Sequence, residues 1–234
     1  NYLFPGDVLP NLSGQVNSSY AQSQALADKY LLEENIIVQY GAFLGRIVEG
    51  DWGYSLSSGQ PVFEHILLLF PATIELCVYA LVVAIVFGIP SGVIAAVFHK
   101  RWPDKVINSL TLMGFSIPIF WLALLLIMVF CLGLGLFPMS GRIGLLYEIE
   151  PYSHFILVDI ISQGFPYGGL AFIDALKHLA LPTIVLAMYP TTVLIRFTRD
   201  SMLNVLEQNY IKTARAKGLN RRQLILHHAL RNAL

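Results

Sequence analysis

The sequence predicts an all-α integral membrane protein, and three observations support this fold class. Of the 234 residues, 56% are hydrophobic and only 13% are charged, a composition more apolar and less charged than that of soluble domains. Three apolar stretches are long enough to cross a bilayer as helices. The formal net charge is zero, but residues 1–68 hold seven acidic and two basic side chains, whereas residues 195–234 hold eight basic and two acidic ones.

Residues 1–68 form the first predicted region and residues 69–234 the second. In the first region, apolar residues recur at helical spacing from Ile36 to Val48, which predicts one amphipathic helix before the turn-forming run GDWGYSLSSGQP. The two cysteines, Cys77 and Cys131, lie in apolar stretches, which excludes a disulfide framework. The sequence starts without a methionine and stops inside a helical pattern, so we expect it to be part of a longer chain.

Three membrane spans are predicted, because a helix rises about 1.5 Å per residue and the hydrocarbon core is about 30 Å thick. They cover about residues 72–98, 106–136 and 179–195. Prolines lie inside all three spans: Pro90, Pro118, Pro182 and Pro190. Such prolines are tolerated where neighbouring helices satisfy the freed carbonyl groups, so we expect the spans to pack as a bundle.

A fourth apolar stretch, residues 155–173, is excluded as a span by the distribution of basic residues. With three spans, 11 Lys and Arg residues face the cytoplasm and 4 face outward, whereas four spans reverse these numbers. Basic loops favour the cytoplasmic side. We therefore place 99–105 and 199–234 in the cytoplasm and 1–68 and 137–178 outside, with 155–173 lying on or dipping into the outer surface.

The segment 199–234 contains the most specific local pattern. A basic amphipathic helix is predicted over Met202–Lys217, and Gly218 can take the left-handed conformation that ends a helix. Asn220, with Gln223 three residues later, predicts the start of a second helix. The pattern is therefore helix, glycine, helix.

Two interpretations of this segment remain open from the residues. Ala214 and Gly218, four residues apart on one helix face, would let another protein approach the backbone closely. This favours a rigid elbow held in a cleft of a cytoplasmic subunit, whose motion would tilt the spanning helices. A solvated basic helix that binds anionic lipid explains the same charges.

Glu75 is the only acidic residue well inside a predicted span, where a charge costs about 2.5–3.5 kcal/mol. It could line a translocation path and contact peptide amines. It could also reach outward from the outer end of its helix, because Pro71 lies only four residues before it. In the outer loop, Glu148, Glu150 and Asp159 are interpreted as solvated acids rather than as an acidic mouth for cationic peptides.

The sequence contains no G-x-S-x-G, H-E-x-x-H, Walker-type glycine loop or CxxC motif. His227 and His228 are adjacent and point to different sides of a helix, so they cannot chelate one metal from one face. An intramembrane enzyme needs several polar groups at one depth, and only Glu75 qualifies. A membrane-tethered nucleic-acid binder usually has a core of three helices, whereas the tail has two.

Several runs of the sequence resemble one family. The tail SMLNVLEQNYIKTARAKGLNRRQLILHHALRNAL is similar to the cytoplasmic coupling-loop signature of type I ABC-importer permeases of the dipeptide/oligopeptide branch. The likeness extends to GDWGYSLSSGQPV, FPATIELCVYALVVAIVFGIPSGVIAA, RWPDKVINSLTLMGFSIPIFWLALLL, GLFPMSGR and LKHLALPTIVLAMYPTTVLIRFTRDSM. Within the branch, MSGRIGLLYEIEPYSHFILVDI and IELC most resemble Sap-type permeases of antimicrobial-peptide transport.

The resemblance implies part of a type I ABC importer transmembrane domain, a MetI-like bundle of six helices, with one helix before and two after this sequence. Residues 1–68 would be a periplasmic segment and 69–234 a truncated domain of the bacterial inner membrane. The implied partners are a second permease subunit in a heterodimer, two cytoplasmic ATPase subunits, a periplasmic peptide-binding protein and membrane lipid, but no nucleic acid. This chain would bind no cofactor, since ATP and Mg²⁺ would sit on the ATPase subunits.

The implied function is that of a permease subunit, not an enzyme, that moves cationic or antimicrobial peptides. Other cargo of the branch stays open: di- and oligopeptides, metal chelates, polyamines or haem. Lys212 and Thr213 stand where the wider importer signature has Glu and Ala. Glu75 is the candidate residue on the cargo path. The resemblance assigns ATPase coupling to Tyr210, Ala214, Arg215, Lys217, Gly218 and Leu219.

Overall fold

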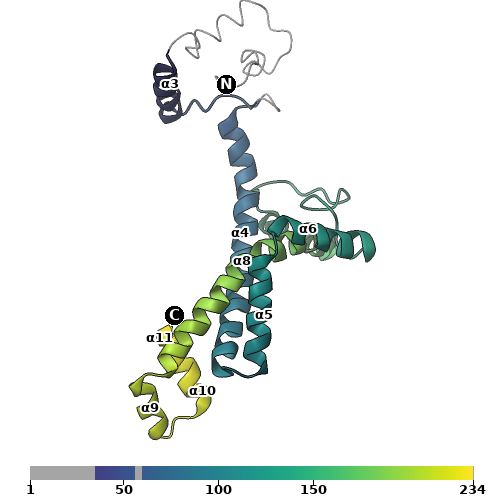
Figure 1. Ribbon diagram of the computed structural model, residues 1–234. Coiled ribbons are helices and arrows are strands. Elements are labelled where there is room, and N and C mark those ends of the chain that lie inside the picture. The colour runs from purple at the N-terminus through teal and green to yellow at the C-terminus, as the bar shows by residue number, and fades with distance from the viewer. Residues whose placement is uncertain (1–34, 56–59, 234) are drawn as a thin grey trace, which may run out of the picture. The chain divides into compact units, whose positions relative to one another are not determined.

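The structure is a computed structural model that describes residues 35–55 and 60–233 (Figure 1). In these residues every regular element is a helix, and the only strand-like pairing is an isolated bridge between Tyr54 and Pro61. The prediction of an all-α protein is therefore confirmed. The chain divides into two compact units, residues 1–71 and 72–234, and helix α4 (Val62–Val97) belongs in part to each.

In the first unit, α3 (Ile36–Glu49) is the amphipathic helix that the apolar spacing predicts. The Asn35 side chain caps it by accepting a hydrogen bond from the backbone N–H of Ile37 at 3.2 Å. The helix ends at Gly50, whose φ of +89° lies in the left-handed region that favours glycine. Residues 1–34 lie outside the described residues, and the predicted location of this region outside the membrane stays a prediction.

In the second unit, small residues recur at every fourth position of α4 and are all buried: Ala80, Ala84, Gly88, Gly92 and Ala96. This stripe faces α8 (Leu170–Leu206). A Cβ added at Gly92 would lie 2.6 Å from the Cβ of Thr198, and one at Gly88 would lie 2.8 Å from that of Leu194. The two helix backbones therefore approach one another as closely as small residues allow in membrane bundles.

Helix α8 is 37 residues long and continues through Pro182 and Pro190. At about 1.5 Å per residue it is longer than a bilayer core of about 30 Å, so it extends beyond the apolar range 179–195. It begins nine residues before that range, directly after Gly169, which has a φ of +84°. The predicted loop 137–178 accordingly contains α7 (Ile156–Ser162), the 3₁₀ helix η2 (Pro166–Gly169) and the first turns of α8.

The predicted span 106–136 is not one straight helix. It is divided between α5 (Trp102–Ser116) and a second piece, α6 (Ile119–Leu126), which continues into the π-helical η1 (Ile127–Gly133). The two pieces differ in direction by 103°. The residue before a proline is driven to extended backbone, and Ile117, before Pro118, has a ψ of 122°. In the described residues two helices are long and apolar enough to span a membrane, or three if this bent pair is one span.

The last elements are short: α9 (Asn209–Ala216), α10 (Arg221–Gln223), the π-helical η3 (Leu224–Ala229) and α11 (Leu230–Ala233). Figure 1 shows them folded back beside the end of α8. The single helix predicted over Met202–Lys217 is wrong in one respect, since α8 ends at Leu206 and α9 begins at Asn209. This break lets α9 turn back toward α8.

Candidate functional site

We call residues 207–233 the hook, because these short helices bend back and share a core with α8. Ile211 of α9 is 1% exposed and Leu224 is 3% exposed, although both lie in a basic, largely solvent-facing segment. The core also contains one residue of α4, so the hook is attached to two of the long helices. Its buried members are Ala96, Met202, Ile211, Leu224, Ala229 and Ala233.

The helix–glycine–helix pattern predicted for the hook is confirmed at its turn. Gly218 has a φ of +84°, and its N–H donates to the carbonyl of Arg215 at 3.0 Å. The Asn220 side chain then accepts a hydrogen bond from the N–H of Gln223 at 2.8 Å, which caps the second helix. The left-handed glycine and the Asn220 cap therefore set the direction in which α10 leaves α9.

The six residues assigned to ATPase coupling lie together on α9 and the turn that follows it. Arg215, Lys217 and Gly218 are exposed, and nothing in the described structure lies within 4 Å of a Cβ added at Gly218. Tyr210 is 42% exposed, and its hydroxyl accepts a hydrogen bond from the Asn232 side chain of α11 at 3.0 Å.

Ala214 and Leu219 differ from the other four, because each is only half-exposed. Ala214 packs against the core of the hook, so its small size serves the internal packing of this chain. The exposed part of the predicted coupling surface therefore consists of Tyr210 and Arg215 on α9 and of Lys217 and Gly218 in the turn. Its contact with an ATPase subunit stays a prediction.

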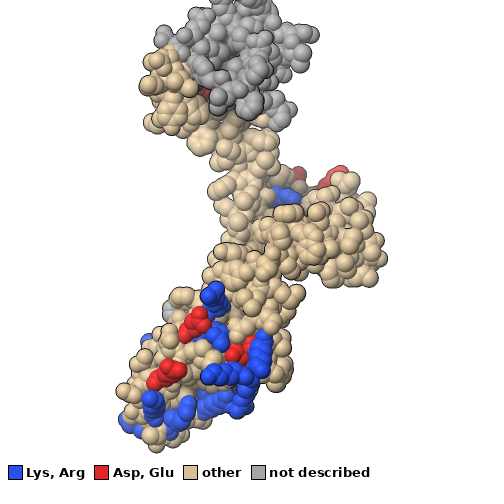
Figure 2. Space-filling view, in the orientation of Figure 1, with Lys and Arg blue, Asp and Glu red and all other residues tan. Residues whose placement is uncertain are grey.

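Basic side chains gather around the hook and the turn between α4 and α5 (Figure 2). They belong to two sequence segments that the fold brings to the same end of the second unit. The exposed members are Lys100, Arg101, Lys105, Lys212, Arg215, Lys217, Arg221, Arg222 and Arg231. A surface of this charge suits an acidic partner or anionic lipid.

A buried ion pair joins the α4–α5 turn to α8 beside this surface. Asp104, in the first turn of α5, is 4% exposed. Its carboxylate accepts hydrogen bonds from Arg199 Nε at 2.7 Å and Arg199 Nη2 at 3.2 Å. The backbone N–H of Lys100 and the side chain of Asn108 donate to the same carboxylate at 2.8 and 2.7 Å. We call this contact the helix ion pair.

A second ion pair, which we call the loop ion pair, holds the loop between η1 and α7 to α4. Glu75 is 2% exposed, and Arg142 Nη2 donates to its carboxylate at 2.7 Å. The backbone N–H groups of Ile156 and Leu157, which begin α7, donate to it at 3.2 Å each, as does the Tyr79 hydroxyl. Glu75 therefore accepts four hydrogen bonds.

Two interpretations of acidic residues are wrong in the structure. Glu75 does not reach outward from a helix end, because α4 begins at Val62 and the Glu75 side chain is buried. Asp159 is not a solvated loop acid: it is 2% exposed and accepts hydrogen bonds from the backbone N–H and the hydroxyl of Ser153 at 2.7 and 2.6 Å. Both carboxylates organise the loop around α7.

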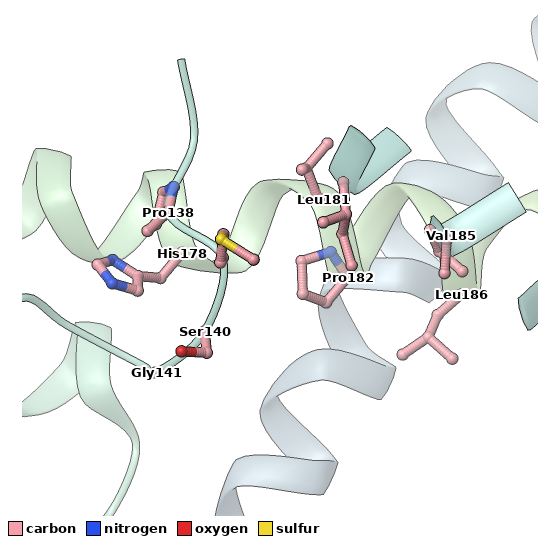
Figure 3. Close-up of a pocket in the computed structure, with 11 residues that line it drawn as sticks. Pro138, Ser140, Gly141, His178, Leu181, Pro182, Val185 and Leu186 are labelled. Carbon is pink, nitrogen blue, oxygen red and sulfur yellow. The ribbon is translucent and has the colours of Figure 1, made fainter. Parts of the chain in front are cut away.

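A cavity of about 300 Å³ lies between α6, η1, α8 and the irregular segment 138–141. Figure 3 shows Pro138, Ser140 and Gly141 of that segment facing His178 and Pro182 of α8. Most of its lining is apolar, and His178 and Ser140 are its polar side chains. Asp174 holds the ring of His178, since its carbonyl oxygen lies 2.9 Å from His178 Nδ1. The volume is at the lower end of ligand-sized pockets.

In the part of the chain that the structure describes, no three His, Cys, Asp or Glu side chains group as metal ligands. The expectation that this chain binds no cofactor stays a prediction. Sequence reasoning missed Asp104, Arg142 and Arg199, because charges at the edges of apolar stretches look solvated and their partners are 67 and 95 residues away. It also missed the small-residue stripe on α4, although the spacing of four residues is visible in the sequence.

Residues 88–234 match the family model described as "Binding-protein-dependent transport system inner membrane component". The chain belongs to this family. Its membership of this family and its apolar helices show that it is a multi-pass protein of the inner membrane and a translocation subunit of an ABC transporter. The predictions of the family and of the membrane location are confirmed.

The chain is similar to curated permease proteins of peptide and putrescine transport systems. It is 40% identical over 235 residues to the di/tripeptide transport system permease protein DppB of Pseudomonas aeruginosa, covering 99% of this chain and 68% of the relative. It is 44% identical over 188 residues to the putrescine export system permease protein SapB of Escherichia coli K12, covering 80% and 59%. Against the dipeptide transport system permease protein DppB of the same strain it is 40% identical over 236 residues, covering 100% and 69%. The chain therefore spans 59% to 69% of the length of these relatives.

Proposed function

We propose that this chain is the permease subunit of a peptide importer in which ATPase subunits push on the hook and thereby tilt the spanning helices. The observation that supports this most is the shared core of the hook with α4 and α8. A force on the exposed turn at Gly218 would be carried by packed side chains rather than by a flexible tail. The exposed basic surface around that turn suits a soluble partner.

The proposed partners are a second permease subunit, two ATPase subunits on the cytoplasmic side and a periplasmic peptide-binding protein. ATP and Mg²⁺ belong to the ATPase subunits in this proposal, and the energy reaches the permease as movement. Two conformations, open to opposite sides, would be populated in turn as the ATPases close and separate.

For the cargo we propose peptides, with cationic peptides as the preferred class. The relatives named DppB support di- and tripeptides, and SapB proteins are named both for peptide transport and for putrescine export. The cavity beside His178 has the mixed apolar and polar lining that a peptide residue would fit. Glu75 stays a proposed residue of the cargo path but would act indirectly, because its partner Arg142, whose side chain is 40% exposed, is the group that could contact a carboxylate of the peptide.

The test uses two substitutions at one position of the full-length permease with its partners. Gly218→Glu adds bulk and negative charge to the exposed turn, and we expect the chain to insert into the membrane while the ATPase subunits no longer co-purify with it. Gly218→Asn is the matched control, because Asn tolerates the left-handed backbone and adds no charge. Normal co-purification and peptide uptake with Gly218→Glu would reject the coupling role of this turn.

A further inference from the structure

The α4–α5 turn is held by two separate contacts at the end of the second unit where the hook lies. One is the helix ion pair, through which α8 binds the first turn of α5. The other is the guanidinium of Arg221 in α10, which lies 5.7 Å from the centre of the Phe98 ring. The same short turn is therefore attached both to α8 and to the hook.

The geometry of the helix ion pair restrains the position of α5 relative to α8. Arg199 presents two different nitrogen atoms to the Asp104 carboxylate, and such a planar two-point contact restrains both distance and orientation. Asp104 is buried, so separation of the pair would leave a charge away from water. Sliding of α5 along α8 at this end would therefore break the contact.

The turn itself is shaped around the same carboxylate. Lys100 has a φ of +64°, a left-handed conformation that is uncommon for a residue with a side chain. Its N–H donates to Asp104 at 2.8 Å, which compensates for that conformation. Asp104 thus fixes the end of α4, the turn and the start of α5 as one unit.

Movement of α5 would reach the cavity described above. Helix α5 leads through the bend at Ile117 and Pro118 into α6 and η1, and Ala123 and Ile127 of these elements line the cavity. Helix α8 lines its other side, with His178 and Pro182 among the lining residues. A contact that fixes α5 to α8 near the hook would therefore influence how the two walls of the cavity move relative to each other.

We propose that Asp104 and Arg199 are positioning residues that make α5 follow the hook, so that ATP hydrolysis is coupled to movement of cargo. This inference rests on the proposed function, and it names the contact through which the hook acts on α5. Neither residue touches nucleotide or cargo in this scheme. Without the helix ion pair, the hook and α8 would move and α5 would not follow them fully.

The first test measures peptide transported per ATP hydrolysed by the complete transporter in lipid vesicles. Asp104→Asn keeps the shape of the side chain and removes its charge, and we expect the ratio to fall roughly 2- to 30-fold, the range typical of altered coupling between sites. The matched control is Asp200→Asn, since Asp200 bonds to the same Arg199 at 3.2 Å but its side chain is 57% exposed. A purely structural role for Asp104 would lower the amount of assembled transporter and leave the ratio unchanged, and that result would overturn the inference.

The second test keeps Asp104 and Arg199 intact, so it also applies if Asp104→Asn fails to assemble. Spin labels are placed on Ser109→Cys in α5 and Ala216→Cys in the hook, after Cys77 and Cys131 are replaced by Ala. We expect the distance between the labels to stay constant when ATP is bound and hydrolysed. A distance that changes through the cycle would overturn the inference. A wild-type transporter that moves no peptide with ATP would instead reject the proposed function.

Discussion

The two ion pairs use the same chemistry in different ways. Each has a nearly buried carboxylate and an Arg partner far away in the sequence. In the loop ion pair, Glu75 is bonded largely by the first amides of α7 and by Tyr79 of its own helix. In the helix ion pair, two of the four hydrogen bonds come from Arg199 on a different long helix.

The two Arg residues also differ in how far their side chains are exposed to solvent. The side chain of Arg142 is 40% exposed, whereas that of Arg199 is 16% exposed. The loop ion pair therefore fastens a loop to a helix and keeps its Arg within reach of solvent. The helix ion pair fastens two helices to each other, and its Arg is less exposed to solvent. The element on which the partner lies therefore decides whether a buried carboxylate shapes a surface or joins two helices.

Loss of the Glu75 carboxylate should have the largest effect on stability. Glu75→Ala leaves the Tyr79 hydroxyl and two amides of α7 without their acceptor, whereas Arg142 keeps the carbonyl oxygen of His154. Each buried donor left unsatisfied costs about 1–3 kcal/mol. We expect the hydrogen exchange of residues 142–157 to rise sharply while the amides of α8 stay protected. Glu64→Ala, which removes an exposed carboxylate from the same helix, is the control. Equal effects of the two substitutions would contradict the account of the loop ion pair.

Replacing the two Arg residues one at a time should lower the stability of the transporter by different amounts. Arg199→Ala leaves Asp104 with two of its four hydrogen bonds, whereas Arg142→Ala leaves Glu75 with three. Because one hydrogen bond to a charged group is worth about 1.5–3 kcal/mol, we expect Arg199→Ala to be the more destabilising by about that amount. Thermal unfolding of the purified transporter in detergent measures the difference. If Arg142→Ala proves the more harmful, the contrast drawn between the two pairs is wrong.

The elements that sequence reasoning predicted well are those that local chemistry decides. The apolar stretches, the amphipathic helix over residues 36–48, the left-handed Gly218 and the cap at Asn220 depend on neighbouring residues alone, and the structure contains each of them. Helix ends were predicted less well. The first turns of α8 before residue 179 contain Asp174 and Lys177, so an apolar criterion stops short of the true start at Leu170.

The ion pairs could not be predicted in this way, because nothing local shows which distant Arg a carboxylate will meet. The sequence also did not determine which prolines would break their helices. Pro118 breaks its helix, while Pro182 and Pro190 lie inside α8, although all three are in apolar surroundings. The outcome depends on whether neighbouring helices support a continuous α8, which is a property of the packed bundle.

The smallest expected effect concerns the residue next to Arg199. Thr198 is fully buried, and its Oγ1 has no hydrogen-bond partner in the described structure. An unsatisfied buried hydroxyl costs about 1–3 kcal/mol, so Thr198→Val, which keeps the shape, should leave stability unchanged or raise it slightly. The unfolding temperature of the purified transporter measures this. A clear loss of stability would mean that the hydroxyl has a partner in the assembled protein.

The proposed function requires the hook to face the cell interior, where ATPase subunits can push on it. The most direct measurement is labelling of Ala216→Cys by a membrane-impermeant thiol reagent, in a chain without Cys77 and Cys131. Val48→Cys, in the 88% exposed position of α3, is the control from the region predicted to lie outside. We expect intact spheroplasts to label Val48→Cys alone, and Ala216→Cys to react only after the membrane is opened. Labelling of Ala216→Cys in intact spheroplasts would contradict this expectation.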